Sequence, residues 1–292
     1  MTQTRKVLLA MLALYLFWGT EYYAIKIGIR HLPPFLLAGL YSFLGGFILL
    51  IYTLAKKQMK PTRQDIKNAF LSGLFFVFAS AGLLPLATVY IDSGLVAILS
   101  GLSPLIAVLL NWLVLKSARP SAFTVTGIVL GFAGLAVTTI PALGSEAQIS
   151  IKGINFAVLS AVFWAVGMVL TKNASFTINI PARNSLLLMF GGSCLLVSAL
   201  VMGEFRAAST ENLINAAPAL IYIIFASSLI SYYCYLFVLQ KAALMVAGST
   251  AYVCPVVAVI VGSGIGGERL SLYTGIAVAL ILLSLVFISR SK

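Results

Sequence analysis

Glu21 is the residue whose type and position most clearly suggest chemistry. It is the only one of the seven Asp and Glu residues that lies well inside a long apolar run, which begins at Val7. A carboxyl group at membrane depth is costly unless it is protonated, paired or hydrated. Trp18 lies one helical turn earlier on the same face and would place an aromatic wall beside it. This pair predicts a small-molecule site; the alternative is a carboxyl group kept neutral, or bonded to a neighbouring helix, for structure alone.

Two proline-containing segments add further candidates. Tyr252 lies one turn before Pro255, near the middle of an apolar run, where an interfacial anchor has no purpose, so we expect it to line a cavity. Ser100 lies one turn before Pro104 and Asn111 two turns after it, on roughly the same helical face. These two polar side chains would hydrogen-bond either a substrate or another helix. Prolines inside membrane spans free backbone carbonyl groups and can bend helices, so both prolines are candidate hinges, unless they only shape the packing.

Tyr232 and Tyr235 lie on one face of a tyrosine cluster near the end of another apolar run. Tyrosines in such places usually anchor a span at the membrane interface, but one of this pair would also suit a gate. Lys26 lies five residues beyond Glu21, where an ion pair within one helix is poorly aligned, so we expect its ammonium group to reach the outer interface. The single histidine and the spacing of the three cysteines suit no metal site.

The elements that carry these residues are predicted to be membrane-spanning helices. The chain has 292 residues, of which 61% are hydrophobic and 9% are charged, whereas soluble domains have about 25% charged residues. Backbone groups in lipid must be satisfied internally, which leaves helices or a closed barrel, and long continuous apolar runs favour helices. We therefore predict an all-α integral membrane protein.

The apolar runs predict ten transmembrane helices. These lie near residues 7–27, 34–55, 68–90, 94–115, 122–140, 153–172, 184–203, 216–239, 246–266 and 271–288. The connections are short, and segment 141–152, with Pro141 and Gly144, is the natural joint between residues 1–145 and residues 146–292. Each of these halves would contribute five helices to one membrane domain.

The basic residues predict the orientation of these helices. Most of the 19 Lys and Arg residues fall in connections on the side of the N-terminus, above all between Lys56 and Lys67. The positive-inside rule therefore places both termini in the cytoplasm. The net charge of +12 is mainly a topology signal, with some affinity for anionic lipid headgroups, and we expect no nucleic-acid partner.

The two halves share short motifs in the same order. The matching motifs are Phe17-Trp18-x7-Lys26 with Phe163-Trp164-x7-Lys172, Gly45-Gly46 with Gly191-Gly192, and Ser103–Val108 with Cys254–Val259. Because five is an odd number, the second half would enter the membrane in the opposite sense, as in the inverted repeats of many secondary transporters. The paired tryptophans and prolines would then lie near the midplane and mark a central cavity.

The chain resembles the drug/metabolite transporter superfamily, EamA type. The motifs that carry the resemblance are Trp18-Gly19-Thr20 with Ala24-Ile25-Lys26, Pro33-Pro34, Ser103-Pro104-Leu105, Tyr252-x2-Pro255-Val256-Val257-Ala258 and Gly267-Glu268-Arg269-Leu270. The resemblance covers the whole chain. It implies ten helices in two inverted five-helix repeats, a central cavity open alternately to each side, and export or exchange of small metabolites, often amino acids, without nucleotide hydrolysis. The family commonly has a neutral residue at the position of Glu21, so the substrate of a relative does not transfer to this chain.

Secondary transport is therefore the expected function. We expect a small cationic or zwitterionic metabolite, of the amino acid or amine class, to cross the inner (plasma) membrane by alternating access, through an exporter or exchanger. Glu21 would either carry a coupling proton or pair with an ammonium group of the substrate. The expected substrate-binding residues are Trp18, Glu21, Trp164, Tyr252, Ser100 and Asn111, and the expected gating residues are Pro104, Pro255, Tyr232 and Tyr235.

Other functional classes fit the sequence less well. A passive channel or flippase is the main alternative. An intramembrane enzyme is disfavoured, because one loop histidine and one membrane acid make no catalytic constellation. Walker A is absent from the sequence, and Gly262–Gly267 lacks the βαβ context of a dinucleotide-binding loop, so we expect no cofactor.

Overall fold

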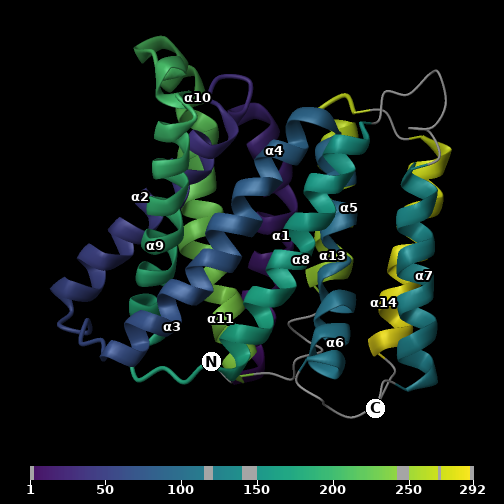
Figure 1. Cartoon of the computed structure of the whole chain (residues 1–292), viewed down its shortest axis with the longest axis horizontal. Helices are drawn as coiled ribbons and strands as arrows, with labels where there is room; N and C mark the ends of the chain where they lie inside the picture. The colour runs from purple at the N-terminus through teal and green to yellow at the C-terminus, as the bar shows by residue number, and fades with distance from the viewer. Residues whose placement is uncertain (1–2, 115–120, 140–149, 242–249, 269–270, 290–292) are drawn as a thin grey trace.

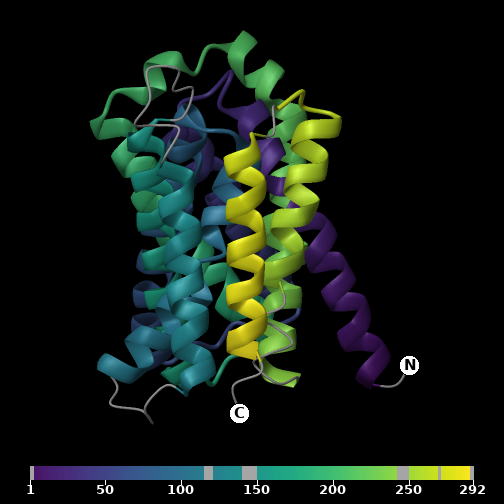
Figure 2. The ribbon, with the colours of Figure 1, turned by 90° about the vertical axis from the view of Figure 1, so that its right-hand side faces the viewer.

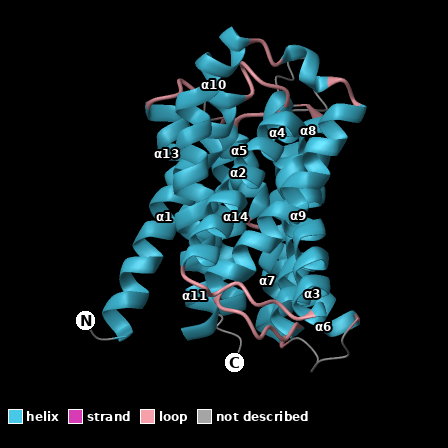
Figure 3. Ribbon diagram, turned by 90° about the vertical axis from the view of Figure 1, so that its left-hand side faces the viewer, coloured by secondary structure: helices cyan, strands magenta, loops and turns pink. Residues whose placement is uncertain are grey.

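The computed structural model describes residues 3–114, 121–139, 150–241, 250–268 and 271–289, and these contain helices but no strand (Figure 3). The helical elements are, in chain order, α1 (Gln3–Gly28), α2 (Pro34–Ala55), α3 (Arg63–Gly73), η1 (Leu74–Ala81), α4 (Gly82–Tyr90), α5 (Ser93–Ser100), α6 (Ser103–Leu113), α7 (Ala122–Thr139), α8 (Ile151–Asn173), α9 (Ile180–Val201), η3 (Glu204–Ala207), α10 (Thr210–Ile223), η4 (Ile224–Ser231), α11 (Tyr232–Lys241), α13 (Thr250–Gly264) and α14 (Leu272–Ser289).

Within the described residues, seven helices are long and apolar enough to cross a membrane, and three further apolar helices are shorter. The seven are Gln3–Gly28, Pro34–Ala55, Arg63–Tyr90, Ser93–Leu113, Ile151–Asn173, Ile180–Val201 and Thr210–Val238; the three are Ala122–Gly134, Val253–Gly264 and Leu272–Ser284. The prediction of an all-helical membrane protein is confirmed.

Polar capping residues explain why two helices begin several residues before their apolar runs. The span predicted from residue 68 begins at Arg63, because Thr62 and Asp65 form a capping box in which each side chain accepts a hydrogen bond from the other residue's backbone. The span predicted from residue 216 begins at Thr210, where the Ser209 side chain accepts from the backbone of Asn212. A cap extends a helix into polar sequence, which an apolar run does not reveal.

The helices lie side by side in one bundle (Figure 1). α2 packs along α9, and α7 and α14 form a pair at one edge. The first half of α1 leans away from the bundle (Figure 2), and several of its leucines are exposed there. α1 begins and α14 ends at the same end of the bundle, called here the terminal end; the opposite end is called the distal end.

One glycine of each repeated pair is a contact point between α2 and α9. A Cβ atom on Gly46 would lie 2.8 Å from the backbone nitrogen of Met189, and one on Gly192 would lie 2.6 Å from that of Phe43. Glycines at such positions let two membrane helices approach until their backbones touch. The Gly-Gly motif shared by the two halves thus serves packing.

Three long helices are locally irregular. η1 and η4 are π-helical and continuous with the α-helices on either side. The helix that begins at Ser93 is interrupted at Gly101 and Leu102, after which Pro104 stands in the first turn of α6. π-Helical turns are frequent at functional sites, and irregular backbone inside a membrane protein is tolerated where it lines a cavity.

Candidate functional site

A cavity of about 120 Å³ lies inside the bundle at these irregular segments. Its wall contains most of the residues that the sequence predicted, namely Trp18, Glu21, Trp164, Ser100, Pro104, Pro255, Tyr232 and Tyr235. One ordered water needs about 10–15 Å³ of such space, so the cavity has room for several waters or a small solute.

The two tryptophans of the repeated Phe-Trp motif meet in this wall. Their ring centroids are 5.6 Å apart with an interplanar angle of 80°. Tyr232 and Tyr235 pack against the Trp18 indole with centroid distances of 5.8 and 5.0 Å, and Phe76 packs against Trp164 at 4.6 Å. Both tyrosines are therefore buried inside the bundle and do not extend to an interface. Edge-to-face contacts of this kind hold aromatic rings in fixed orientations.

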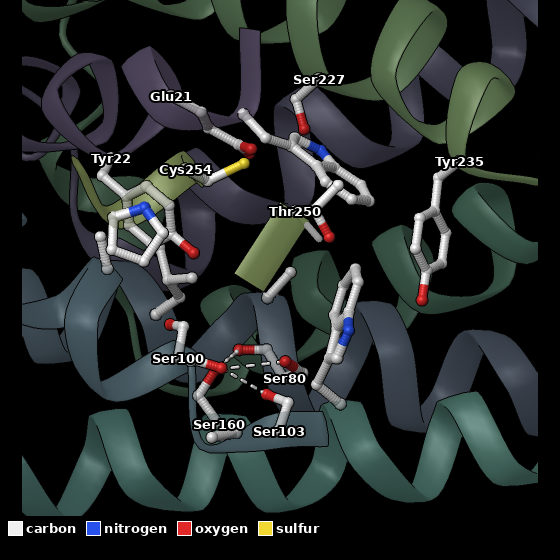
Figure 4. A pocket seen from close by; sticks show the side chains of 18 of the residues that line it. Glu21, Tyr22, Ser80, Ser100, Ser103, Ser160, Ser227, Tyr235, Thr250 and Cys254 are labelled. Carbon is white, nitrogen blue, oxygen red and sulfur yellow. Dashed lines mark hydrogen bonds between the residues drawn. The ribbon is translucent and has the colours of Figure 1, made fainter. Parts of the chain in front are cut away.

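The carboxyl group of Glu21 lies at one side of the cavity (Figure 4). Ser227, which η4 supplies, is also labelled in the wall near it (Figure 4). The thiol group of Cys254 lies nearby (Figure 4). The described lining residues include no Lys or Arg, so no basic side chain neutralises Glu21 within this wall.

Four serines face Glu21 from the other side of the cavity (Figure 4). The hydroxyl groups of Ser80 and Ser160 are 3.1 Å apart, and that of Ser160 donates to the Ser80 carbonyl oxygen at 2.9 Å. The Ser103 hydroxyl donates to the Ser100 carbonyl oxygen at 2.7 Å, across the break between α5 and α6. The cavity therefore has one acidic side and one neutral polar side.

One predicted site residue has another position. Asn111 is not among the lining residues, and its amide donates to the Ala107 carbonyl oxygen of its own helix at 2.9 Å. Asn111 was expected on the same helical face as Ser100, which assumes one continuous helix. The break at Gly101 and Leu102 turns the faces of α6 relative to those of α5. The side chain of Tyr252 lies outside the described part of the chain.

Several lining residues were missed by the sequence reasoning: Tyr22, Tyr41, Ser80, Ser103, Ser160, Ser227, Thr250 and Cys254. Serine, threonine and cysteine are ordinary in membrane helices, where they hydrogen-bond to the backbone, so their type alone carries no signal. Tyr22 follows Glu21 directly in the sequence. Its position next to the membrane acid was the one available signal for it.

A charged cluster joins three elements at the distal end. Lys26, near the end of α1, forms ion pairs with Asp92, just before α5, and with Glu268, just after α13, the latter at 2.9 Å. Glu268 also accepts hydrogen bonds from the Ser93 hydroxyl and backbone at 2.5 and 3.1 Å, and from the Gly94 backbone at 3.1 Å. We call Lys26, Asp92, Ser93, Gly94 and Glu268 the distal cluster. Lys26 was expected to reach towards water; it is instead held by two carboxylates.

Glu268 is ionised at neutral pH in this cluster. Its side chain is only 5% exposed, and that burial by itself raises the pKa. The hydrogen bonds from Ser93, Lys26 and Gly94 outweigh burial and hold the pKa below its ordinary value. A buried carboxylate with this many donors holds the distal ends of α1, α5 and α13 together.

Comparisons with known proteins agree with this architecture. A sequence profile of the EamA-like transporter family matches residues 5–140 and again residues 151–290. The uncharacterized inner membrane transporter YedA of Escherichia coli (strain K12) is 27% identical over 286 residues, which cover 97% of this chain and 90% of YedA. The uncharacterized transporter YvbV of Bacillus subtilis (strain 168) is 30% identical over 205 residues, covering 70% of this chain and 66% of YvbV. A solved crystal structure matches with a TM-score of 0.69 and 18% identity over 98% of this chain and 97% of its own, a likeness of fold.

Proposed function

Because the chain belongs to the EamA-like transporter family, we propose that it is a secondary transporter for a small cationic or zwitterionic metabolite of the amino acid or amine class. The family and the names of its relatives identify a membrane transporter and not an enzyme. The proposed mechanism is alternating access, and the proposed physiological role is export or exchange.

The proposed topology has ten transmembrane helices. In it, residues 1–145 and 146–292 are inverted halves of five helices each, and both termini lie in the cytoplasm at the inner membrane. Three observations support this proposal: the family profile matches the chain twice, η1 and η4 occupy equivalent places in the two halves, and Trp18 contacts its counterpart Trp164. The concentration of basic residues at the terminal end supports the orientation.

Glu21 is the observation that carries the proposed substrate class. Its carboxyl group is in the cavity wall, and no described lining residue is basic. An ammonium group entering the cavity would supply the missing positive charge, and the Trp18 and Trp164 rings beside it would add cation–π attraction. In the alternative role, Glu21 takes up a coupling proton when the cavity is closed to water. The serines opposite would accept or donate hydrogen bonds to the rest of the substrate.

Counterflow in liposomes tests the proposal. Purified protein is reconstituted into vesicles loaded with an unlabelled amine or amino acid, and a trace of the labelled compound is added outside. A carrier is expected to accumulate the label transiently above its equilibrium level, and the initial rate should saturate with concentration. Flux that is linear, unsaturable and without an overshoot would contradict alternating access and favour a channel.

The distal cluster is the proposed closure of the cavity on the outer side. The lining residue Met168 lies in the last two turns of α8, towards the terminal end, whereas the distal cluster ties the opposite ends of the helices. Opening the cavity outward would require α1, α5 and α13 to separate there, which breaks these ion pairs. The cluster would therefore stabilise the state that is closed to the outside.

Glu268→Gln is expected to speed up labelling of Cys254 from the outside by about tenfold, equivalent to about 1.4 kcal/mol of lost closed-state stabilisation. Cys254 suits this test because it is buried in the cavity wall. Cys194 and Cys234 are first replaced by serine, and a membrane-impermeant thiol reagent is added to intact cells. Glu211→Gln, an exposed carboxyl change in the first turn of α10, is the matched control. Equal labelling rates in all three proteins would show that the cluster does not close the cavity.

A further inference from the structure

Arg183 is a buried cation that the cavity does not use. It lies in the first turn of α9, it is only 8% exposed, and its Nε atom is enclosed without a hydrogen-bond partner. The ion pairs between described residues all involve Lys26, so Arg183 has no carboxylate partner among them. A guanidinium group cannot lose its charge near neutral pH, and burying it without acceptors is strongly unfavourable. Nε of Arg183 is therefore a buried donor that no described residue satisfies.

The Phe176 ring packs against one face of the Arg183 guanidinium group and leaves its N–H donors without an acceptor from this ring. The ring centroid lies 4.1 Å from the guanidinium carbon of Arg183. A cation–π contact uses the face of the planar group, whereas the N–H bonds lie in its plane. The donors are therefore held in a fixed plane, a geometry that matches two oxygens of a phosphate group or carboxylate.

The nearby carboxylate of Asp65 is already occupied. It accepts hydrogen bonds from the backbone and hydroxyl of Thr62 at 2.8 and 2.7 Å, and from those of Thr177 at 2.8 and 2.5 Å. These bonds fasten the connection that contains Phe176 to the start of α3. α3 and the start of α9 lie side by side at the terminal end (Figure 1). The Asp65 carboxylate thus bonds to Thr62 and Thr177, and it forms no ion pair with Arg183 among the described residues.

The surface around this connection is basic. Two side chains hydrogen-bond to the connection. Gln58 accepts from the Asn179 side chain at 2.9 Å, and Asn68 donates to the Ser175 carbonyl oxygen at 2.8 Å. Five exposed basic residues lie close to Gln58 or Asn68 in the sequence: Lys56, Lys57, Lys60, Arg63 and Lys67. Their combined field attracts anions, and basic pockets between membrane helices are known to bind lipid headgroups. Arg183 also lies near the end of a membrane-crossing helix, where lipid phosphates are found.

We propose that Arg183 and the basic surface around it bind the phosphate of an anionic phospholipid headgroup at the terminal end of the bundle. The Arg183 donors bind the phosphate oxygens, Phe176 holds the guanidinium plane, and the exposed lysines select lipids that carry net negative charge. This site is separate from the cavity and does not depend on the identity of the transported substrate.

Thermal unfolding of the full-length protein in neutral detergent tests the site. We expect phosphatidylglycerol to raise the melting temperature of the wild type more than phosphatidylcholine does. In Arg183→Gln this difference is expected to disappear, with at least a tenfold weaker apparent affinity for phosphatidylglycerol. Lys152→Gln, which removes an exposed positive charge from the first turn of α8, away from this basic surface, is expected to keep the difference.

Three outcomes would overturn the proposal. The first is an equal response of Arg183→Gln and the wild type to phosphatidylglycerol. The second is an equal loss in Lys152→Gln, which would indicate general charge attraction. The third is full stabilisation by inorganic phosphate at the same phosphate concentration, which would assign the site to a soluble anion. If Arg183→Gln does not fold, Arg183→Lys keeps the charge and loses the planar donors, and it should show a reduced lipid response.

Discussion

Glu21→Gln is expected to reduce transport by at least about 30-fold while the protein still folds, since losing a buried charge pair costs about 2–5 kcal/mol. The amide has nearly the same shape as the carboxyl group, so the packing around residue 21 should be kept. It carries no negative charge for an ammonium group and cannot exchange a proton near neutral pH. Initial uptake rates in liposomes measure the loss of transport, and the elution profile on gel filtration shows whether the variant still folds.

Binding separates the two proposed roles of Glu21. If it pairs with the substrate, the thermal stabilisation given by an amine or amino acid should disappear in Glu21→Gln, because ligand stabilisation follows the logarithm of the ligand excess over Kd. If it carries a proton, that stabilisation should persist while transport driven by a pH gradient is lost. Glu211→Gln, remote on α10, is the control and should behave as the wild type. Wild-type transport in Glu21→Gln would contradict both roles.

Gly191→Leu is expected to destabilise the bundle by about 3 kcal/mol or more, because the added side chain has no room. Even a Cβ atom at Gly191 would lie 2.4 Å from the Cβ of Val77 and 2.6 Å from the carbonyl oxygen of Gly73. The carbonyl group belongs to the helix backbone and cannot turn aside. α3 and η1 would have to move away from α9, which would disturb the segment that carries Ser80. The melting temperature and the yield of monodisperse protein in detergent report the effect.

Gly275→Leu is the matched control for this substitution. Gly275 also lies inside a helix, α14, but a Cβ atom there would have no described neighbour within 4 Å. The change in helix propensity and hydrophobicity is the same in both variants, so only the difference in space remains. A Gly191→Leu protein as stable as Gly275→Leu would show that the close approach of α3 and α9 is not needed.

Much of the candidate site could be predicted because its residues are unusual in lipid. A carboxyl group in an apolar run is costly wherever the helix packs, so Glu21 was recognisable from the sequence alone. Trp18 and Trp164 were recognisable because the same motif occurs in both halves. The structure places these three residues in one cavity wall, with Ser100, Pro104 and Pro255.

Two other polar residues of the cavity wall could not be predicted in this way. Ser80 and Ser227 face the cavity from π-helical segments, whose extra residue per turn changes which side chains point inward. Nothing in the local sequence of η1 distinguishes it from an ordinary apolar helix. Asn111 was placed by counting along a continuous helix, and the interruption at Gly101 and Leu102 invalidated the count.

The sequence by itself determined the membrane environment, the helical class and the position of the acid, since composition and apolar run length act through the solvent and require no knowledge of contacts. The tertiary structure alone decided which side chains meet. Lys26 forms ion pairs with Asp92 and Glu268 from other elements, whereas Arg183 has no carboxylate partner among the described residues. Those outcomes depend on helix phase, on close approaches at glycines and on the paths of connections, which arise only when the helices pack together.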